Sequence, residues 1–600
     1  MKRRQFVEAA VSTPFVGRLG GAAAATRPLA RVRPGDRDWP SAARWERLRE
    51  QTGGRLLALN SPFDTCRMDP TGADCLELFR SLKNPYAIGD DIALTQTTGW
   101  ADAWTSQPST YAVAAESAED VAAALNFARE NRLRLVVKGG GHSYLGTSSA
   151  PDSLLIWTRR MNRVVLHDGF VPQGCDMAPV PAVSVGAGAI WMQTYDAVTT
   201  HGGRYVQGGG CATVGVAGLV LSGGFGSYSK AYGTAAASLL EAEVVTADGL
   251  VRIANSCVHP DLFWALKGGG GGSFGVVTRL TLRTHELPDR FGIADVNIHA
   301  RSDASFRALI RQFVDFYAQS LFNPHWGEIV NIRHGRRLEI SMESQALNDG
   351  QMATIWQPFL RWVATSGELS FVTPPLLRSG PARHRWDPAF LRSHLAGAVM
   401  SDRRPNAPSG NIFWSANLSE AGHFIHGYDS IWLPAALLRN AEQRAKLSDA
   451  LFEAGRIWPI ELHFQKGLAG ASPEVTEAAA QTATNPAMRE AFVLAIIGSE
   501  GPPARPDLPG YEPDLPAARS DAAHIGKAMV VLRKLVPDSG SYVAESNFFE
   551  PNWQRSYWGT NYARLLEVKR RYDPGGLFFV HHGVGSENWS ADGFTPAAEP

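Results

Sequence analysis

Residues 135–146 read LVVKGGGHSYLG, and residues 208–218 read GGGCATVGVAG. In each stretch a triple glycine is followed by a reactive side chain, His142 in the first and Cys211 in the second. Glycine allows positive φ and lets backbone N–H groups approach a ligand closely, so such runs suit a pyrophosphate. The first run directly follows a strand-like apolar stretch, where a flexible linker is not expected. The two stretches therefore predict a site for a phosphate-bearing cofactor.

The sequence does not support the other common nucleotide-binding motifs or a serine hydrolase site. No Gly-x-Gly-x-x-Gly opens a helix after a strand, and no glycine run ends in the Lys-Ser/Thr of a P-loop. Residues 271–275, GGSFG, match the nucleophile elbow of serine hydrolases, but strand-like residues 276–282 follow where that elbow requires a helix. No Cys-x-x-Cys pair is present, so no metal site is expected.

Around these motifs, the first half of the chain reads as short strands and helices separated by glycine. Residues 111–115 and 133–137 are strand-like, and Ser117 predicts the N-cap of a helix that runs between them to residue 132. Further strands are expected at 183–186, 242–246 and 276–282.

The pattern changes near residue 288. From there to about residue 535, amphipathic stretches such as 305–320 alternate with strands such as 337–342, and the proline-rich residues 501–517 predict a surface loop. The predicted fold class is α+β, in two domains. The first covers residues 40–287, the second is inserted over 288–535, and a C-terminal segment, 536–600, returns to the first.

The composition excludes several classes of protein. Hydrophobic residues make up 44% and charged residues 19% of the 600 residues, unlike a disordered chain. Lys+Arg and Asp+Glu number 58 each, so no basic field for nucleic acid is expected. No apolar stretch approaches the roughly 20 residues of a membrane span. The expected partners are small molecules, and the oligomeric state is left open.

Residues 1–28 are similar to a bacterial twin-arginine signal peptide. Arg3 and Arg4 precede a weakly apolar stretch and the run Ala22–Ala25. The pattern predicts export of the folded protein to the periplasm or the medium of a bacterium. An ordinary basic N-terminus is the alternative.

The five cysteines are an odd number, so at least one stays unpaired. Cys66 and Cys75 lie nine residues apart in a Pro/Gly/Asp-containing stretch, where they either close a short disulfide loop or remain two free thiols. Cys211 is the cysteine whose surroundings indicate chemistry.

Further motifs accompany the two glycine stretches. Residues 261–267 read DLFWALK before a run of five glycines, and residues 557–565 and 568–574 read YWGTNYARL and VKRRYDP. Together these motifs resemble the berberine-bridge-enzyme-like branch of the vanillyl-alcohol-oxidase flavoprotein family. Residues 581–587, HHGVGSE, resemble its fungal-type alcohol oxidases. The resemblance covers most of the first half and the C-terminal segment.

The resemblance implies a two-part PCMH-type FAD-binding domain, with an inserted substrate domain built on an antiparallel sheet backed by helices. It also implies two covalent bonds to FAD, from His142 to the flavin 8α carbon and from Cys211 to C6. The other residues expected to bind FAD are Lys138, Gly139, Gly140, Gly141, Ser143, Gly146, Gly210, Thr213, Val214, Gly215, Gly218, Gly275, Val277 and Asn561. Departures from the family pattern occur at Ala237, Ser238 and Ser273.

Hydride removal from a carbon that bears a hydroxyl needs a base for the hydroxyl proton. The tyrosine that is often this base in the family is replaced here by Glu545, within YVAESN at 542–547. Residues 460–465, IELHFQ, alternate, so Glu461, His463 and Gln465 share one face of a predicted strand. That face is either exposed to solvent or part of the substrate sheet. The base candidates are Glu545 and His463, followed by Tyr542 and Glu461.

These features predict an FAD-dependent oxidoreductase that moves a hydride to flavin N5 from the hydroxyl-bearing carbon of an alcohol, a sugar or a phenolic alcohol. In the resembled branch, a valine at the position of Val214 accompanies oxidases, so O2 is the expected acceptor and H2O2 the product. A dehydrogenase that uses a quinone and a flavin-binding protein without turnover remain alternatives.

Overall fold

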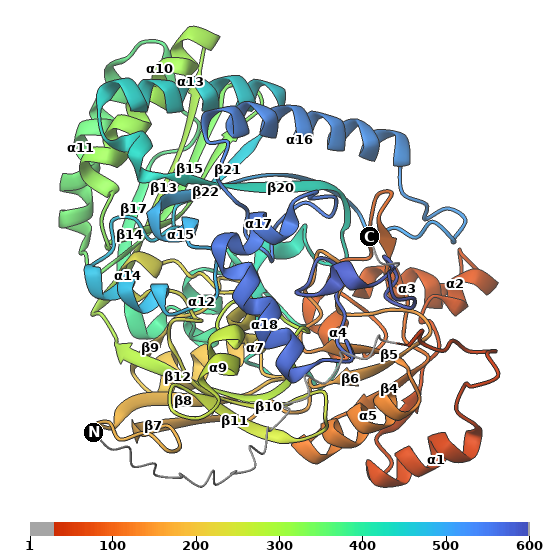
Figure 1. Ribbon diagram of the computed structural model, residues 1–600. Helices are drawn as coiled ribbons and strands as arrows, with labels where there is room; N and C mark the ends of the chain where they lie inside the picture. The colour runs from red at the N-terminus through yellow and green to blue at the C-terminus, as the bar shows by residue number, and fades with distance from the viewer. Residues whose placement is uncertain (1–28, 598–600) are drawn as a thin grey trace, which may run out of the picture.

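Two lobes make up residues 29–597, the part of the chain that the computed structural model describes (Figure 1). The two-sheet lobe contains residues 29–286 and 541–597, and the ten-stranded lobe contains residues 290–536. The predicted α+β class is confirmed.

The first sheet of the two-sheet lobe positions the first glycine run. Its strand order is β1-β4-β6-β5. Helix α5 (Ala118–Glu130) connects β4 (Tyr111–Ala114) to β5 (Arg134–Lys138), and Ser117 caps it together with Asp120, as the sequence predicts. The other two strands are β1 (Leu56–Ala58) and β6 (Ser153–Trp157). The glycine run therefore begins where β5 ends.

The second sheet of this lobe is antiparallel, with order β11-β10-β12-β8-β7 and β9 paired to β12. Its strands are β7 (Val164–Phe170), β8 (Val180–Gly186), β9 (Arg204–Val206), β10 (Leu239–Val245), β11 (Val251–Asn255) and β12 (Val276–Glu286). Because β12 begins directly after the GGSFG stretch, no helix follows Ser273 and the hydrolase elbow is excluded.

The ten-stranded lobe has an antiparallel sheet of order β16-β13-β15-β14-β21-β22-β20-β2-β3, with β17 paired to β13. Its strands are β13 (Arg290–Ala300), β14 (Trp326–Arg333), β15 (Arg337–Gln345), β16 (Leu369–Phe371), β17 (Leu376–Pro381), β20 (Phe424–Pro434), β21 (Ile460–His463) and β22 (Ala491–Gly501). Two short strands from the other lobe, β2 (Gly99–Trp100) and β3 (Trp104–Thr105), complete it through the parallel pairing of β2 with β20.

Four long helices cover this sheet at the top of Figure 1: α10 (Asp303–Phe316), α11 (Asp349–Thr365), α13 (Ala441–Ile457) and α16 (Leu515–Leu535). Their apolar faces and the strands form one large core that includes Phe313, Trp356 and Leu451. The helix predicted over 305–320 continues past α10 as a π-helical turn, Tyr317–Leu321.

A bridging segment, residues 382–420, lies between β17 and β20 in sequence but packs on the two-sheet lobe. It contains α12 (Pro388–His394), β18 (Val399–Ser401), β19 (Ile412–Trp414) and a 3-10 turn, η4 (Ser415–Leu418). Trp386 stacks on Tyr195 with ring centroids 4.4 Å apart, and both belong to the core of the two-sheet lobe. The sequence contains no signal for this crossing.

The end of the chain returns to the two-sheet lobe through α17 (Trp553–Trp558) and α18 (Tyr562–Tyr572). Trp558 and Leu565 are fully buried in its core. The buried Lys569 ammonium donates to Ser273 O at 2.7 Å, which ties α18 to the third glycine run.

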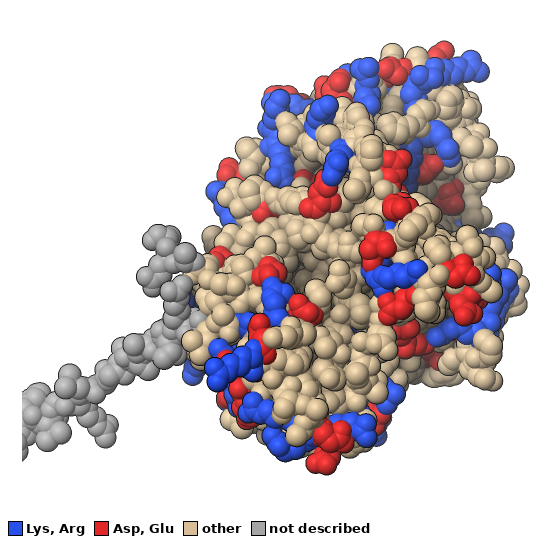
Figure 2. All heavy atoms as spheres, turned by 90° about the vertical axis from the view of Figure 1, so that its right-hand side faces the viewer, with Lys and Arg blue, Asp and Glu red and all other residues tan. Residues whose placement is uncertain are grey.

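Charged side chains of both signs are interspersed on the face drawn in Figure 2, and the surface is hollowed near its centre. Within residues 29–597, no helix is long and apolar enough to cross a membrane.

Two disulfides stabilise the two-sheet lobe. Cys66 pairs with Cys75, one of the two alternatives that the sequence leaves open, and Cys175 pairs with Cys257, which the sequence analysis did not anticipate. Cys211 is the free cysteine.

Replacing Cys175 and Cys257 by serine is expected to lower the free energy of unfolding by up to about 4 kcal/mol, because that bond closes a long loop. Serine at Cys66 and Cys75 costs about 2–3 kcal/mol, because the loop is short. Thermal unfolding followed by circular dichroism measures both. The reverse ranking contradicts loop closure as the source of the stability.

Candidate active site

The two glycine stretches meet in the two-sheet lobe. His142 Nε2 lies 3.0 Å from Thr213 Oγ1. A Cβ on Gly140 would lie 2.7 Å from Gly215 N, so the two loops pack backbone against backbone and position 140 requires glycine. This contact brings the first predicted flavin-bonding residue next to the loop that contains the second.

His142 and Cys211 both have surroundings that suit a covalent bond to a ligand. Burial and the nearby His423 lower the pKa of His142 to about 4, so its imidazole is neutral and nucleophilic at neutral pH. Cys211 has a free thiol, and Asn417 Nδ2 donates to its sulfur at 3.4 Å.

The glycine loops leave room for a ligand as well. No atom of the described residues lies within 4 Å of a Cβ placed on Gly210 or Gly218, on either side of Cys211 in sequence. Open space at these positions, a neutral imidazole and a free thiol fit the FAD that the resemblance implies. His142, Cys211, Gly210 and Gly218 are the residues suited to hold it.

Several other residues expected to bind FAD are engaged elsewhere. The Lys138 ammonium donates to three carbonyls, those of Asp91, Ile92 and Leu94, and burial lowers its pKa to about 7. Ser143 Oγ accepts from Thr147 N and Oγ1. These side chains fix the loops around the glycine run.

Four more of these residues also serve packing. A Cβ on Gly275 would lie 2.6 Å from Val244 Cγ2, and Val277 is buried in the second sheet. Asn561 Nδ2 donates to Thr484 O at 2.8 Å, joining α18 to the ten-stranded lobe. Gly146 has φ of 69° and packs against the Trp104 ring.

A polar cluster forms at the end of β21. Strand β21 ends at His463, so Gln465 lies in the following turn and not on the predicted strand face. His463 Nε2 lies 3.4 Å from Glu461 Oε2, and the Lys466 ammonium pairs with the Glu545 carboxylate. The structure therefore brings three of the four base candidates together.

Protonation differs between the two members of the His463–Glu461 pair. Burial opposes ionisation of Glu461, but the hydrogen bond from His463 and the nearby Arg333 guanidinium outweigh it and lower the Glu461 pKa to about 2. Burial and the Lys466 charge lower the pKa of His463, against the opposing effect of Glu461. His463 Nδ1 is buried and has no hydrogen-bond partner among residues 29–597. A neutral His463 that donates Nε2–H to Glu461 presents a free lone pair at Nδ1.

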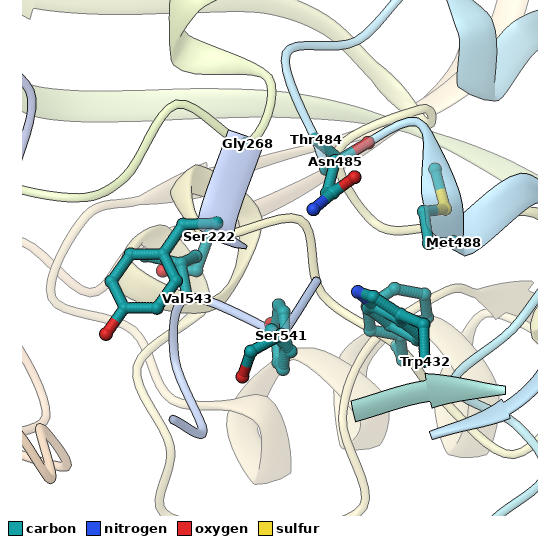
Figure 3. Close-up of a pocket in the computed structure, with 11 residues that line it drawn as sticks. Ser222, Gly268, Trp432, Thr484, Asn485, Met488, Ser541 and Val543 are labelled. Carbon is teal, nitrogen blue, oxygen red and sulfur yellow. The ribbon is translucent and has the colours of Figure 1, made fainter. Parts of the chain in front are cut away.

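The Tyr542 carbonyl accepts from Glu545 N at 2.9 Å, but its side chain packs elsewhere. Its hydroxyl accepts from Gly224 N at 3.3 Å, its ring contacts Phe225 and Trp432, and burial raises its pKa. It lines the small cavity of Figure 3 together with Ser222, Gly268, Trp432, Thr484, Asn485, Met488, Ser541 and Val543. None of His142, Cys211 and His463 lines that cavity.

Two carboxyl groups near the cluster were not predicted from the sequence. Glu328 on β14 accepts from Ser227 Oγ and from Gln465 Nε2, and it has φ of 75°, a strained value inside a strand. Burial and the neighbouring Glu343 raise its pKa. Burial and the neighbouring Glu500 raise the pKa of Glu420, in the bridging segment, to about 8.

A signal for Glu328 was present in the sequence. The preceding Gly327 interrupts a strand pattern, and glycine in a strand often marks a close approach of another backbone. A Cβ there would lie 1.7 Å from Ser227 O, in the other lobe. Glu420 carries no comparable signal.

Comparison with known proteins identifies an FAD-binding domain in this chain. The family profile described as "FAD binding domain" matches residues 109–255, and that described as "Berberine and berberine like" matches residues 541–585. The FAD-linked oxidoreductase malF of Malbranchea aurantiaca is 30% identical over 597 residues, which cover 95% of this chain and 94% of that protein.

Solved structures are similar in fold. The VAO-type flavoprotein MtVAO615 of Myceliophthora thermophila C1 superposes with a TM-score of 0.76 at 26% identity, covering 94% of this chain and 99% of that one. The glucooligosaccharide oxidase of Acremonium strictum, described with 6-S-cysteinyl, 8α-N1-histidyl FAD, has a TM-score of 0.60 at 21% identity, covering 80% and 92%.

The prediction of bacterial twin-arginine export to the periplasm is wrong. The relatives that match nearly the whole chain come from fungi, and the twin-arginine reading assumed a bacterial cell. A pair of arginines near a basic N-terminus is too short a pattern to identify a route by itself. Residues 1–28 themselves lie outside the described part of the structure.

The FAD-binding profile, the full-length similarity and the meeting of His142 with the Cys211 loop agree with one another. The chain belongs to the vanillyl-alcohol-oxidase family of FAD-linked oxidoreductases, in its berberine-bridge-enzyme-like branch.

Proposed function

We propose that this chain is an oxidase that converts the carbinol group of an alcohol, sugar or phenolic alcohol to a carbonyl, with O2 as acceptor and H2O2 as product. FAD, joined to His142 and Cys211, supplies the hydride acceptor when bound. An oligosaccharide oxidase among the proteins that share this fold is in keeping with a sugar-type hydroxyl.

The observation that carries the proposal is the free Nδ1 of His463 beside the ionised Glu461. A hydride leaves a carbinol carbon readily only when the hydroxyl proton is removed. His463 can take that proton at Nδ1, while Glu461 holds the tautomer and stabilises the imidazolium that forms. Glu545 is the second candidate, because its carboxylate is already paired with Lys466.

An anaerobic screen tests this proposal. The purified protein is mixed with alcohols, oligosaccharides and phenolic alcohols, and loss of flavin absorbance identifies a substrate. Air is then admitted, and peroxide is measured against substrate oxidised. An oxidase gives equal amounts of peroxide and product. Reduced flavin that persists in air but reacts with a quinone indicates a dehydrogenase, and no bleaching with any class of compound favours a flavin-binding protein without turnover.

Val214→Leu is expected to slow reoxidation of the reduced flavin by about tenfold, which corresponds to about 1.4 kcal/mol in the barrier. Val214 is half-buried at the turn that follows Cys211, and its carbonyl accepts from Trp191 N at 3.0 Å, so the backbone there is fixed. An added methylene fills a small void through which O2 would approach.

Stopped-flow absorbance measures the two half-reactions separately. Anaerobic reduction should change little, and the exposed Val171→Leu should change neither rate. Equal reoxidation rates in wild type and Val214→Leu contradict the role of Val214.

A further inference from the structure

The environment of Cys211 disfavours the thiolate, which is the form of cysteine that acts as a nucleophile. Burial raises the pKa of the thiol, and the nearby carboxyl groups of Glu420 and Glu545 add to this effect. Lys466 is the nearby cation that opposes it, and its ammonium is already paired with Glu545. Covalent attachment through Cys211 therefore needs another group that stabilises the sulfur.

Asn417 is placed to do this. Its Nδ2 donates to Cys211 Sγ at 3.4 Å, and its Oδ1 is buried without a hydrogen-bond partner in the described part of the chain. An amide N–H is a neutral hydrogen-bond donor. It can stabilise negative charge on sulfur without forming an ion pair with a nearby carboxylate such as Glu545. The contact joins residues 206 positions apart in the sequence.

The bridging segment holds Asn417 rigidly against the lobe that contains Cys211. Tyr86 Oη donates to Ile412 O at 2.7 Å, and Asn84 Nδ2 donates to Asp402 Oδ1 at 2.8 Å. Arg404 pairs with Asp90 at 2.7 Å. The amide is thus anchored to the same lobe as the sulfur.

We propose that Asn417 is a positioning residue for flavin attachment, whose amide N–H orients the Cys211 sulfur and stabilises its thiolate. The inference rests on the proposed covalent bond between Cys211 and the flavin. In the net reaction, the Cys211 S–H bond and one flavin ring C–H bond break and one C–S bond forms. The two protons and two electrons released convert one O2 to H2O2.

Asn417→Asp tests the proposal, because it keeps the shape of the side chain and replaces the donor by a carboxylate. The purified holoprotein is denatured and digested, and mass spectrometry gives the fraction of Cys211 peptide that carries flavin. We expect this fraction to be complete in the wild type and at least about tenfold lower in Asn417→Asp, with the His142 bond retained. Asn417→Gln, which keeps the donor, should restore part of it.

The dependence on pH separates a role at the sulfur from a role in folding. In aerated Asn417→Asp, bond formation at Cys211 should accelerate about tenfold per pH unit between pH 7 and 9, since the thiolate fraction rises by that factor below the thiol pKa. Asn411→Ala is the matched control, because it loses a hydrogen bond to Asp402 in the same segment but does not contact Cys211.

Each outcome decides the proposal. Asn417→Asp that carries as much flavin on Cys211 as the wild type overturns it. Loss of the Cys211 bond in Asn417→Asp and Asn411→Ala alike, without dependence on pH, also overturns it, since the role is then structural. A wild type without flavin on Cys211 refutes the proposed double attachment itself and is seen before any variant is made.

Discussion

His463→Ala is expected to lower kcat by about 10³-fold while FAD content and the thermal midpoint stay close to those of the wild type. The side chain is buried, its Nδ1 has no partner within the described structure, and its Nε2 faces Glu461. Removing it takes away the proton acceptor but leaves the covalent sites at His142 and Cys211 untouched. Anaerobic flavin reduction, measured by stopped flow, reports this step directly.

The pH profile identifies the role of Glu461. Its carboxylate raises the pKa of His463, so Glu461→Gln lowers that pKa further. Because the reaction needs neutral His463, the acid limb of the rate profile should move to lower pH in Glu461→Gln, with a loss of about tenfold in kcat at the optimum. An acid limb that moves to higher pH contradicts this assignment.

Glu545→Gln is the matched comparison for His463→Ala. It removes the carboxylate that pairs with Lys466 and keeps the shape of the side chain. If His463 is the base, Glu545→Gln costs much less in kcat than His463→Ala. A larger loss in Glu545→Gln assigns the base to Glu545 instead.

The double variant His142→Ala/Cys211→Ser is expected to release all of its flavin on acid precipitation, whereas the wild type and both single variants release none. A covalent bond survives denaturation of the protein, so either link alone keeps the precipitate yellow. His142 supplies a neutral imidazole and Cys211 a free thiol, from two loops in direct contact.

Absorbance of pellet and supernatant gives the result, and mass spectrometry of flavin peptides assigns the bonds. The exposed His201→Ala controls for loss of a histidine elsewhere, and it should bind flavin as the wild type does. Flavin in the wild-type supernatant contradicts covalent attachment, and release from one single variant shows that only the other residue forms the bond.

Local sequence was sufficient to predict those helices and strands that are stabilised by interactions between neighbouring residues. Ser117 and Asp120 cap α5 through a local capping box, and Val276–Glu286 extends because β-branched residues are frequent there. The motifs that contain His142 and Cys211 could also be recognised in the sequence, because each glycine run and the residue after it form one loop. The polar strand at 460–465 was predicted, but its end at His463 was not, because the turn to Lys466 depends on contacts with other elements.

The α+β class, the family and the two loops that contain His142 and Cys211 could all be predicted from the amino-acid sequence. The groups that surround these two residues depend on how distant segments pack together. Asn417 reaches Cys211 because the bridging segment crosses from one lobe to the other, and Glu328 meets Ser227 because Gly327 allows the lobes to touch. Tyr542 and Glu545 lie three residues apart, yet one enters an apolar cavity and the other the polar cluster. Periodicity and capping act over a few residues, whereas these contacts arise from packing between segments hundreds of residues apart, which no local pattern encodes.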